Sequence, residues 1–175
     1  EILDVRFLHT REDLVGKFDV AICCENIEHI IDDRKLLKDI FLCLKPGGRL
    51  LLTAPNLLYR AITHEDNGPF STVEDGGHVR RGYQESMLLE LCEDVNLIPN
   101  NISYCSGFLS QKITALQRLI GRIHPILGWV CILPLRILPP LFDRVVSFLL
   151  DWPYYSICIE AYKPRLEVSE QRNEK

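Results

Sequence analysis

Residues 18–53 contain two buried-strand patterns separated by one helical pattern. Residues 18–24, FDVAICC, form a nearly continuous apolar run of strand length, which is typical of a central strand in a parallel sheet. In residues 33–44 the apolar positions recur with helical spacing, and Asp32 is a candidate N-cap. Residues 49–53, RLLLT, form a second apolar strand. This order predicts a β-α-β unit with two parallel strands.

The rest of the chain continues the alternation of short strands and helices. Apolar positions predict strands in residues 5–8, 102–105 and 155–162 and helices in residues 84–95 and 108–123. Residues 123–142 are strongly apolar but contain four prolines, so we expect two short helices that meet near Pro134. These elements predict an α/β fold with a mostly parallel sheet and a helical insertion or lid, residues 108–150, before the last strand.

The composition is that of a globular protein and excludes several other classes. The chain of 175 residues is 47% hydrophobic and 25% charged, which excludes a wholly disordered chain. Its net charge is −4, so no overall basic field exists to attract nucleic acid, and we expect no nucleic-acid partner. The seven cysteines form no C-x-x-C pair, and most lie in apolar runs, which favours reduced thiols and a cytoplasmic location.

Four short motifs follow one another through the β-α-β unit. They read Phe18-Asp19-Val20, Glu25-Asn26-Ile27-Glu28-His29, Leu44-Lys45-Pro46-Gly47-Gly48 and Thr53-Ala54-Pro55-Asn56. This stretch resembles the second half of class I S-adenosylmethionine-dependent methyltransferases of the small-molecule type. In that family a strand ends in an E-x-L-E-H segment and is followed by a helix, L-K-P-G-G and another strand. The resemblance is good over residues 18–56 and looser elsewhere, and it implies a Rossmann-like methyltransferase sheet.

The resemblance also implies that the first part of the family's sheet has no counterpart in this sequence. The family holds its cofactor with a G-x-G-x-G turn and with an acidic residue at the end of the second strand. The glycine pairs of this sequence, Gly47-Gly48 and Gly76-Gly77, lie elsewhere in the pattern. We therefore expect a partial methyltransferase domain, residues 1–164, that is truncated at the N-terminus and is inactive alone. Residues 165–175 form a charged tail that we expect to be disordered.

Positions in the family indicate which residues would contact S-adenosylmethionine. The loop that packs on the adenine corresponds to Thr10 and Arg11, although family members often carry an acidic residue in place of Thr10. The residue after the next strand, here Cys24 or Glu25, usually lies against the adenosine or the sulfonium. For Cys24, simple packing in the core is the alternative.

Two histidines are candidates for the general base. His29 ends the E-x-x-E-H segment, and His78 lies in a stretch that covers the substrate side in similar enzymes. An imidazole with a pKa near neutrality is suited to remove a proton from an oxygen nucleophile. For both histidines, a hydrogen bond that ties a loop to the backbone is the alternative.

The E-x-x-E-H segment raises the question of a metal. Glu25, Glu28 and His29 would share one face of a helix and could converge on a divalent cation, and ubiquinone-type O-methyltransferases are similar in this arrangement. Hydrogen bonds at the strand-to-helix turn are the simpler interpretation, so we assign no metal. The neighbouring pair Arg80 and Arg81 could bind an anionic substrate group, with solvated charges as the alternative.

The apolar residues 123–142 allow three interpretations, of which a transmembrane helix is the least favoured. Their longest run without a charge, residues 123–135, is shorter than the ~20 residues that span a bilayer, and the prolines argue further against a transmembrane helix. A lid over the acceptor entrance is the first interpretation. Peripheral contact with a membrane is the second, because Trp129 among many leucines and isoleucines suits an interface.

These observations predict S-adenosylmethionine-dependent methyl transfer to a small-molecule or lipid-linked acceptor, at an oxygen atom. The alternative is a non-catalytic methyltransferase-like domain that serves as a partner or as a membrane-associated scaffold. A glycine-rich cofactor loop in the same protein would favour the enzyme, and a protein without one would favour the scaffold.

Overall fold

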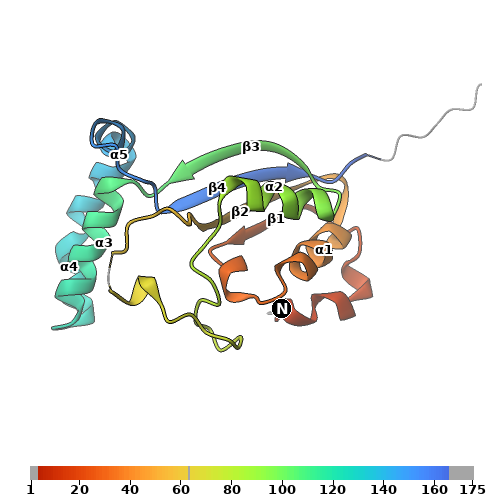
Figure 1. Ribbon diagram of the computed structural model, residues 1–175, viewed down its shortest axis with the longest axis horizontal. Helices are drawn as coiled ribbons and strands as arrows, with labels where there is room; N and C mark the ends of the chain where they lie inside the picture. Colours follow the sequence, from red (N-terminus) through yellow and green to blue (C-terminus); the bar gives the residue numbers. More distant parts are fainter. Residues whose placement is uncertain (1–3, 63, 166–175) are drawn as a thin grey trace, which may run out of the picture.

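The computed structural model describes residues 4–62 and 64–165 (Figure 1). The strands are β1 (Phe18–Cys24), β2 (Leu44–Pro55), β3 (Ile98–Cys105) and β4 (Ser156–Tyr162). The α-helices are α1 (Asp33–Cys43), α2 (Glu85–Asp94), α3 (Phe108–Gly121), α4 (Pro125–Ile132) and α5 (Leu138–Leu149). Short 3-10 helices are η1 (Val5–Thr10), η2 (Glu12–Leu14), η3 (Ile27–His29), η4 (His64–Asn67) and η5 (Pro134–Ile137). The predicted tail falls outside the described residues from residue 166 on.

The four strands form one mixed sheet in the order β1-β2-β4-β3. The predicted parallel pair is confirmed, because Cys24 of β1 lies beside Thr53 of β2 in a parallel register. The prediction of a mostly parallel sheet is wrong, since β4 is antiparallel to both of its neighbours. The reason is the path of the chain: β3 leads directly into the helices α3–α5, and β4 returns from them between β2 and β3. The other three strands therefore share one direction, and β4 alone runs against them.

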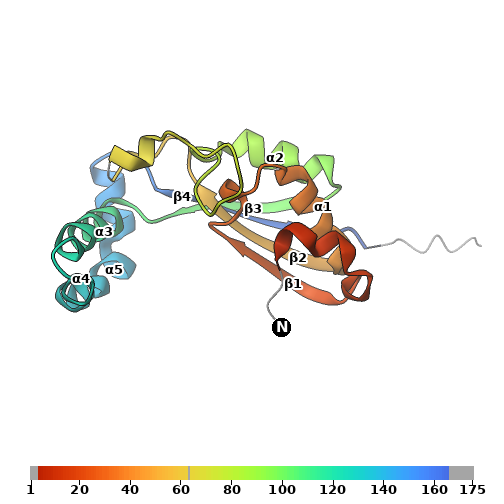
Figure 2. The same cartoon turned by 90° about the horizontal axis from the view of Figure 1, so that it is seen from below.

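One face of the sheet carries the core, and it is covered by α1 and α2 (Figure 2). Asp32 caps α1 by accepting a hydrogen bond from the backbone nitrogen of Lys35 at 2.9 Å, as predicted. The apolar stripes of both helices pack on inward-facing residues of β2 and β4; the fully buried side chains there include Leu37, Leu88, Leu50, Leu52 and Ile157. On the opposite face apolar side chains are exposed, and Ile22 of β1 is 70% exposed.

Two local predictions are wrong at the start of the chain and after α1. Residues 5–8 form part of η1 and not a strand, because the Asp4 side chain accepts from the backbone nitrogen of Arg6 at 3.0 Å and starts a helical turn. The K-P-G-G segment forms part of β2, whereas the sequence indicated only that it ends α1. Gly47 adopts a φ of +79°, and the register between β1 and β2 shifts beside this segment, so the glycine accommodates a bulge.

Helices α3, α4 and α5 form a helical unit beyond the carboxyl ends of β1, β2 and β3 (Figure 1). The unit has short helices on either side of Pro134, where the prolines predicted a break. No single helix in the described residues is long and apolar enough to cross a membrane. The segments Pro125–Ile132 and Pro134–Leu149 reach that length and composition only together, and they are bent by 44° at their junction.

Asp143 of α5 binds the start of α3 within the helical unit. Its buried carboxylate accepts hydrogen bonds from the backbone nitrogens of Gly107 at 2.9 Å and Leu109 at 2.7 Å, and from the hydroxyl of Ser110. These donors are the first groups of α3, which have no partner inside their own helix. A negative charge at this helix end is further stabilised by the helix dipole.

Replacement of Asp143 by Asn should therefore weaken the packing of the helical unit. The amide has a single acceptor oxygen and no charge, so at least one buried donor loses its partner, and the free energy of unfolding should fall by about 2 kcal/mol. Urea denaturation followed by circular dichroism measures the change. The matched control is Asp151→Asn, an exposed position just after α5, which should change stability by less than about 0.5 kcal/mol. Equal effects of the two substitutions would contradict this role of Asp143.

Candidate functional site

The candidate site begins where β1 ends. The chain leaves the sheet at Glu25, whose φ of +45° turns it sharply and whose backbone nitrogen donates to the carbonyl oxygen of Thr53 at 3.0 Å. The next residues form the single turn η3, which carries Glu28 and His29. Because β1 and β2 are parallel, this turn lies beside the long loop of residues 57–82 that follows β2. In open α/β sheets this end of the strands is where ligands bind.

Glu28 is a buried carboxyl group without full hydrogen bonding. Its side chain is 1% exposed, and its Oε2 atom has no hydrogen-bond partner among the described residues. Burial raises the pKa of Glu28 to about 7, the nearby charge of Glu25 adds to the rise, and His29 opposes it. Glu28 is therefore able to hold or release a proton near neutral pH, where an ordinary glutamate stays ionised.

His29 is held in one tautomer by the loop of residues 57–82. Its Nδ1 atom lies 3.0 Å from the carbonyl oxygen of Gly77. A carbonyl can only accept, so Nδ1 must carry the proton and Nε2 of the neutral ring is left as an acceptor. That Nε2 atom lies 3.8 Å from Oε1 of Glu28, close enough for the two groups to influence each other's charge.

His78 comes from the same loop and forms a cluster with Glu28 and His29. Its ring meets the ring of His29 edge to face, with centroids 4.6 Å apart. Burial lowers the pKa of His78, and the neighbouring His29 lowers it further, which keeps the ring neutral at pH 7. The structure thus brings together both histidines that the sequence indicated, together with Glu28.

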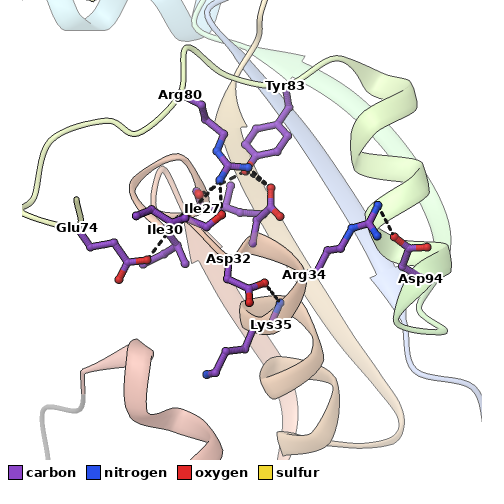
Figure 3. Close-up of polar contacts among 11 residues, drawn as sticks. Ile27, Ile30, Asp32, Arg34, Lys35, Glu74, Arg80, Tyr83 and Asp94 are labelled. Atoms are coloured by element: carbon purple, nitrogen blue, oxygen red, sulfur yellow. Dashed lines mark hydrogen bonds and ion pairs between the residues drawn. The ribbon is translucent and has the colours of Figure 1, made fainter. Parts of the chain in front are cut away.

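Asp33, Arg80 and Tyr83 form a clamp that fixes the loop over η3 and the start of α1. Arg80 pairs with the Asp33 carboxylate and donates to the carbonyl oxygens of Ile30 at 2.8 Å and Ile31 at 2.7 Å. The hydroxyl of the fully buried Tyr83 donates to the same carboxylate at 2.9 Å. Figure 3 shows the guanidinium of Arg80 beside the ring of Tyr83. A backbone bond from Val79 to the carbonyl oxygen of Glu28, 2.9 Å long, adds to the clamp.

The hypothesis that Arg80 and Arg81 bind an anionic substrate is not supported by these contacts. Arg80 is used by the clamp, and Arg81 donates to the carbonyl oxygens of Leu57 and Tyr59 and stacks on the Tyr59 ring. Both guanidinium groups therefore stabilise the conformation of the loop. The sequence shows only a pair of adjacent charges there, and nothing in it distinguishes a structural pair from a binding pair.

One hollow lies beside His78 and another lies along β1. The first is an open cavity of about 500 Å³ in the loop, and His78 forms part of its wall; its other lining residues are Asp66, Pro69, Phe70, Ser71, Asp75 and Gly77. The second is an apolar groove of about 480 Å³ along β1 that reaches Cys24 and Asn26.

The four residues predicted to contact a cofactor fall into two groups. Cys24 is exposed and Glu25 is half-buried, and both lie at the carboxyl end of β1 as expected. Thr10 and Arg11 do not follow a strand: Thr10 ends η1, and its hydroxyl donates to the carbonyl oxygen of Phe7 at 2.7 Å. Arg11 pairs with Asp13. The structure therefore does not place Thr10 and Arg11 in a loop at the end of a strand.

A metal ion could be held by Glu28, His29 and His78, whose ligand atoms all lie within 4.8 Å of one another. This set differs from the one that the sequence suggested, because His78 takes the place of Glu25. The hydrogen bond of His29 to Gly77 uses Nδ1 and leaves Nε2 as the atom that would face an ion, and binding of an ion would require Glu28 to be ionised. That no metal is required stays a prediction.

The clamp and the burial of Glu28 are not apparent from the sequence. Tyr83 and Asp33 lie 50 residues apart, so no local pattern connects them. Glu28 was noticed only as a possible metal ligand or hydrogen-bonding group. The sequence gives one sign that Glu28 is buried. Apolar residues, Ile27 and Ile30, lie on either side of Glu28 and His29.

Comparisons with known proteins give the family and the fold. A family model described as a methyltransferase domain matches residues 4–98, more than half of the chain. A comparison with curated proteins gave no match. Among solved structures, a SAM-dependent methyltransferase from Archaeoglobus fulgidus is similar with a TM-score of 0.56 at 13% identity, covering 93% of this chain and 66% of that chain.

Two further structures are similar to the same degree. The cyclase SpnF has a TM-score of 0.54 at 16% identity, covering 94% of this chain and 55% of SpnF. Phosphoethanolamine N-methyltransferase 2 from Haemonchus contortus, in complex with phosphomonomethylethanolamine and S-adenosylhomocysteine, has a TM-score of 0.54 at 16% identity. The alignment covers 87% of this chain and 35% of that enzyme. This chain thus spans about half of SpnF and about a third of the N-methyltransferase. At such low identities the similarities establish the fold alone.

The raised pKa of Glu28 predicts a pH-dependent cost in stability. The folded state disfavours ionised Glu28, because its pKa is about 7 there and 4.5 in the unfolded chain. The free energy of unfolding therefore falls as the pH rises from 4.5 to 7, by about 3 kcal/mol in total. Replacement by Gln keeps a neutral group at every pH. The free energy of unfolding of Glu28→Gln, relative to the unchanged protein, should therefore increase by about 3 kcal/mol between pH 4.5 and pH 8.

Chemical denaturation across this pH range measures that difference. The matched control is Glu93→Gln on α2, where the side chain is exposed and the difference should stay constant with pH. If the relative free energy of unfolding of Glu28→Gln were also independent of pH, the pKa of Glu28 would not be raised by burial.

Proposed function

Because the chain belongs to the methyltransferase-domain family, we propose that it transfers a methyl group from S-adenosylmethionine to an oxygen atom of a small or lipid-linked acceptor. The observation that carries the proposal is the cluster of Glu28, His29 and His78 at the carboxyl end of β1. This cluster supplies the neutral imidazole of His78 at the end of the sheet where ligands of α/β proteins bind. The Haemonchus contortus enzyme, which has the same fold, was solved with S-adenosylhomocysteine, and this adds support.

The end of β1 fits one side of such a cofactor. The groove beside Cys24 is lined by apolar side chains such as Leu8, Ala21 and Ile22, and an apolar groove suits the flat face of an adenine ring. Glu25 could accept hydrogen bonds from hydroxyl or amino groups there. Thr10 and Arg11 are not part of this proposal. When bound, the cofactor supplies an electrophilic methyl group on a sulfonium.

Each residue of the cluster has a different role in proton transfer. His78 forms part of the wall of the loop cavity, and its lowered pKa leaves it neutral and able to accept the proton of an acceptor hydroxyl. His29, fixed by Gly77, keeps the ring of His78 in place through their edge contact. Glu28 lies behind His29, and its ionised form would stabilise a positive charge on the two rings. Methyl transfer depends strongly on such positioning, because the nucleophile must approach in line.

The non-catalytic alternative gives no reason for a buried, incompletely bonded carboxyl group beside two histidines. Such an arrangement costs stability, and costs of this kind are retained mainly at functional sites. The fold by itself does not decide between reactions, since the cyclase SpnF shares it. The proposal therefore depends on the cluster and must be tested there.

Replacement of His78 by Gln should remove the general base. In the complete protein, supplied with methyl-tritiated S-adenosylmethionine and a polar lipid extract, we expect kcat to fall by about 10²- to 10⁴-fold. The affinity for S-adenosylhomocysteine, measured by calorimetry, should stay the same because His78 is not placed against the cofactor. The residual activity should increase with pH, since hydroxide then replaces the imidazole.

The matched control is His9→Gln, an exposed histidine on η1 whose ring lies beside Lys35. It should leave both quantities unchanged. Full activity of His78→Gln would refute the assignment of the base, and absence of any S-adenosylhomocysteine binding by the complete protein would refute the assignment of the cofactor.

A further inference from the structure

The helical unit buries few apolar side chains and exposes many. Across α3, α4 and α5 the buried residues are Gln111, Gly128, Ile132, Asp143 and Ser147, of which only Ile132 is a large apolar side chain. The outward positions are apolar instead; the most exposed are Ile123 and Phe148, each 82% exposed, followed by Leu149, Leu133, Ile137 and Ile126. This distribution is the reverse of that in a water-soluble helical bundle.

The contacts between these helices use small and polar residues. A Cβ atom on Gly128 of α4 would lie 2.9 Å from the Gln117 carbonyl oxygen and 3.1 Å from Cα of Gly121, so α3 and α4 approach through their backbones. Between α3 and α5 the contacts are hydrogen bonds from Gly107 and Phe108 to Asp143 and Ser147. Close approach at glycines and interhelical hydrogen bonds are the means by which helices associate in lipid, where apolar side chains gain nothing by packing together.

The length of the helices fits a surface position. Helices α4 and α5 contain 8 and 12 residues, which correspond to about 12 and 18 Å, whereas the hydrocarbon core of a bilayer is about 30 Å thick. The segments Pro125–Ile132 and Pro134–Leu149 are bent by 44° at their junction, so they do not form one straight span.

The charges of the unit indicate which kind of lipid surface it would contact. Residues 108–150 contain five basic side chains and one acidic side chain, in a chain whose net charge is −4. The acidic residue, Asp143, is buried at the start of α3 and does not reach the surface, whereas Arg122 and Arg144 are exposed. Arg136 stacks on the ring of Trp129, with 4.7 Å between its guanidinium carbon and the ring centroid. Basic side chains and an exposed Trp beside an apolar face are typical of helices that lie on anionic lipid.

We propose that α4, η5 and α5 insert into the surface of an anionic lipid bilayer and anchor the protein there. The apolar side chains around Ile126, Leu133 and Phe148 enter the acyl region, and the basic side chains contact the headgroups. The inverted burial of the unit and its positive charge together carry the proposal, and neither depends on the reaction that the protein catalyses.

Binding to vesicles tests the proposal. The complete protein is mixed with vesicles of phosphatidylcholine alone, or of phosphatidylcholine with about one third phosphatidylglycerol, and bound protein is separated by flotation. We expect binding at least about tenfold tighter to the anionic vesicles, together with a blue shift of tryptophan fluorescence that is lost in Trp129→Phe. No binding to either vesicle would overturn the proposal.

Matched variants separate insertion from unspecific adsorption. Phe148→Glu should reduce vesicle binding at least about tenfold, whereas Phe7→Glu, an exposed aromatic position on η1, should not reduce it. Arg122→Gln with Arg144→Gln should remove the preference for anionic lipid, and circular dichroism verifies folding of each variant. Equal binding by Phe148→Glu and the unchanged protein would overturn insertion. A dimer that Phe148→Glu dissociates, without any affinity for vesicles, would identify the surface as a contact between protein chains.

Discussion

The carboxylate of Asp33 holds together the two segments from which the candidate site is built. It lies at the start of α1 and receives both the guanidinium of Arg80 and the hydroxyl of Tyr83, which belong to the end of a long loop. The loop contains little regular structure of its own, so its position over η3 depends on bonds of this kind. The negative charge is favourable at a helix N-terminus, so one group serves both α1 and the loop.

The position of the loop explains the unusual state of the residues beneath it. Once Val79 and Gly77 are bonded to the carbonyl oxygen of Glu28 and to the ring of His29, the side chain of Glu28 is shut off from water. Its oxygen Oε2 then has no partner among the described residues, and the folded protein bears the cost. A stable clamp compensates for this local cost, which is the pattern expected where a site is maintained for its chemistry.

Local patterns in the sequence predict most of the elements but not residues 5–8, and they do not predict the full arrangement of the elements. The apolar run of β1, the stripe of α1 and the proline break at Pro134 predicted these features because they depend on neighbours in the chain. The reversed direction of β4 was not predictable from its alternating residues, which suit either direction. The same holds for Arg80, whose partners lie 47 to 50 residues away, and for the contact of His29 with His78. The candidate histidines were found from the sequence, but their contact with each other depends on the fold.

The helical unit and the candidate site lie at the same end of the sheet. The chain passes from the carboxyl end of β3 into α3 after only two residues, Ser106 and Gly107. Figure 2 shows the helical unit beyond the carboxyl ends of β1 and β3. If the unit rests on lipid as proposed, a lipid-linked acceptor would be held at the same end of the sheet as the candidate site, which connects the two proposals.

The clamped loop holds His78 against His29. Titration of the His78 imidazole in heteronuclear NMR spectra of the complete protein tests this contact. We expect a pKa for His78 below its ordinary value, because the ring is buried and has His29 beside it, and a rise of that pKa in His29→Gln. The substitution His9→Gln, on η1, should leave it unchanged. An ordinary pKa for His78 that does not respond to the loss of His29 would contradict the account.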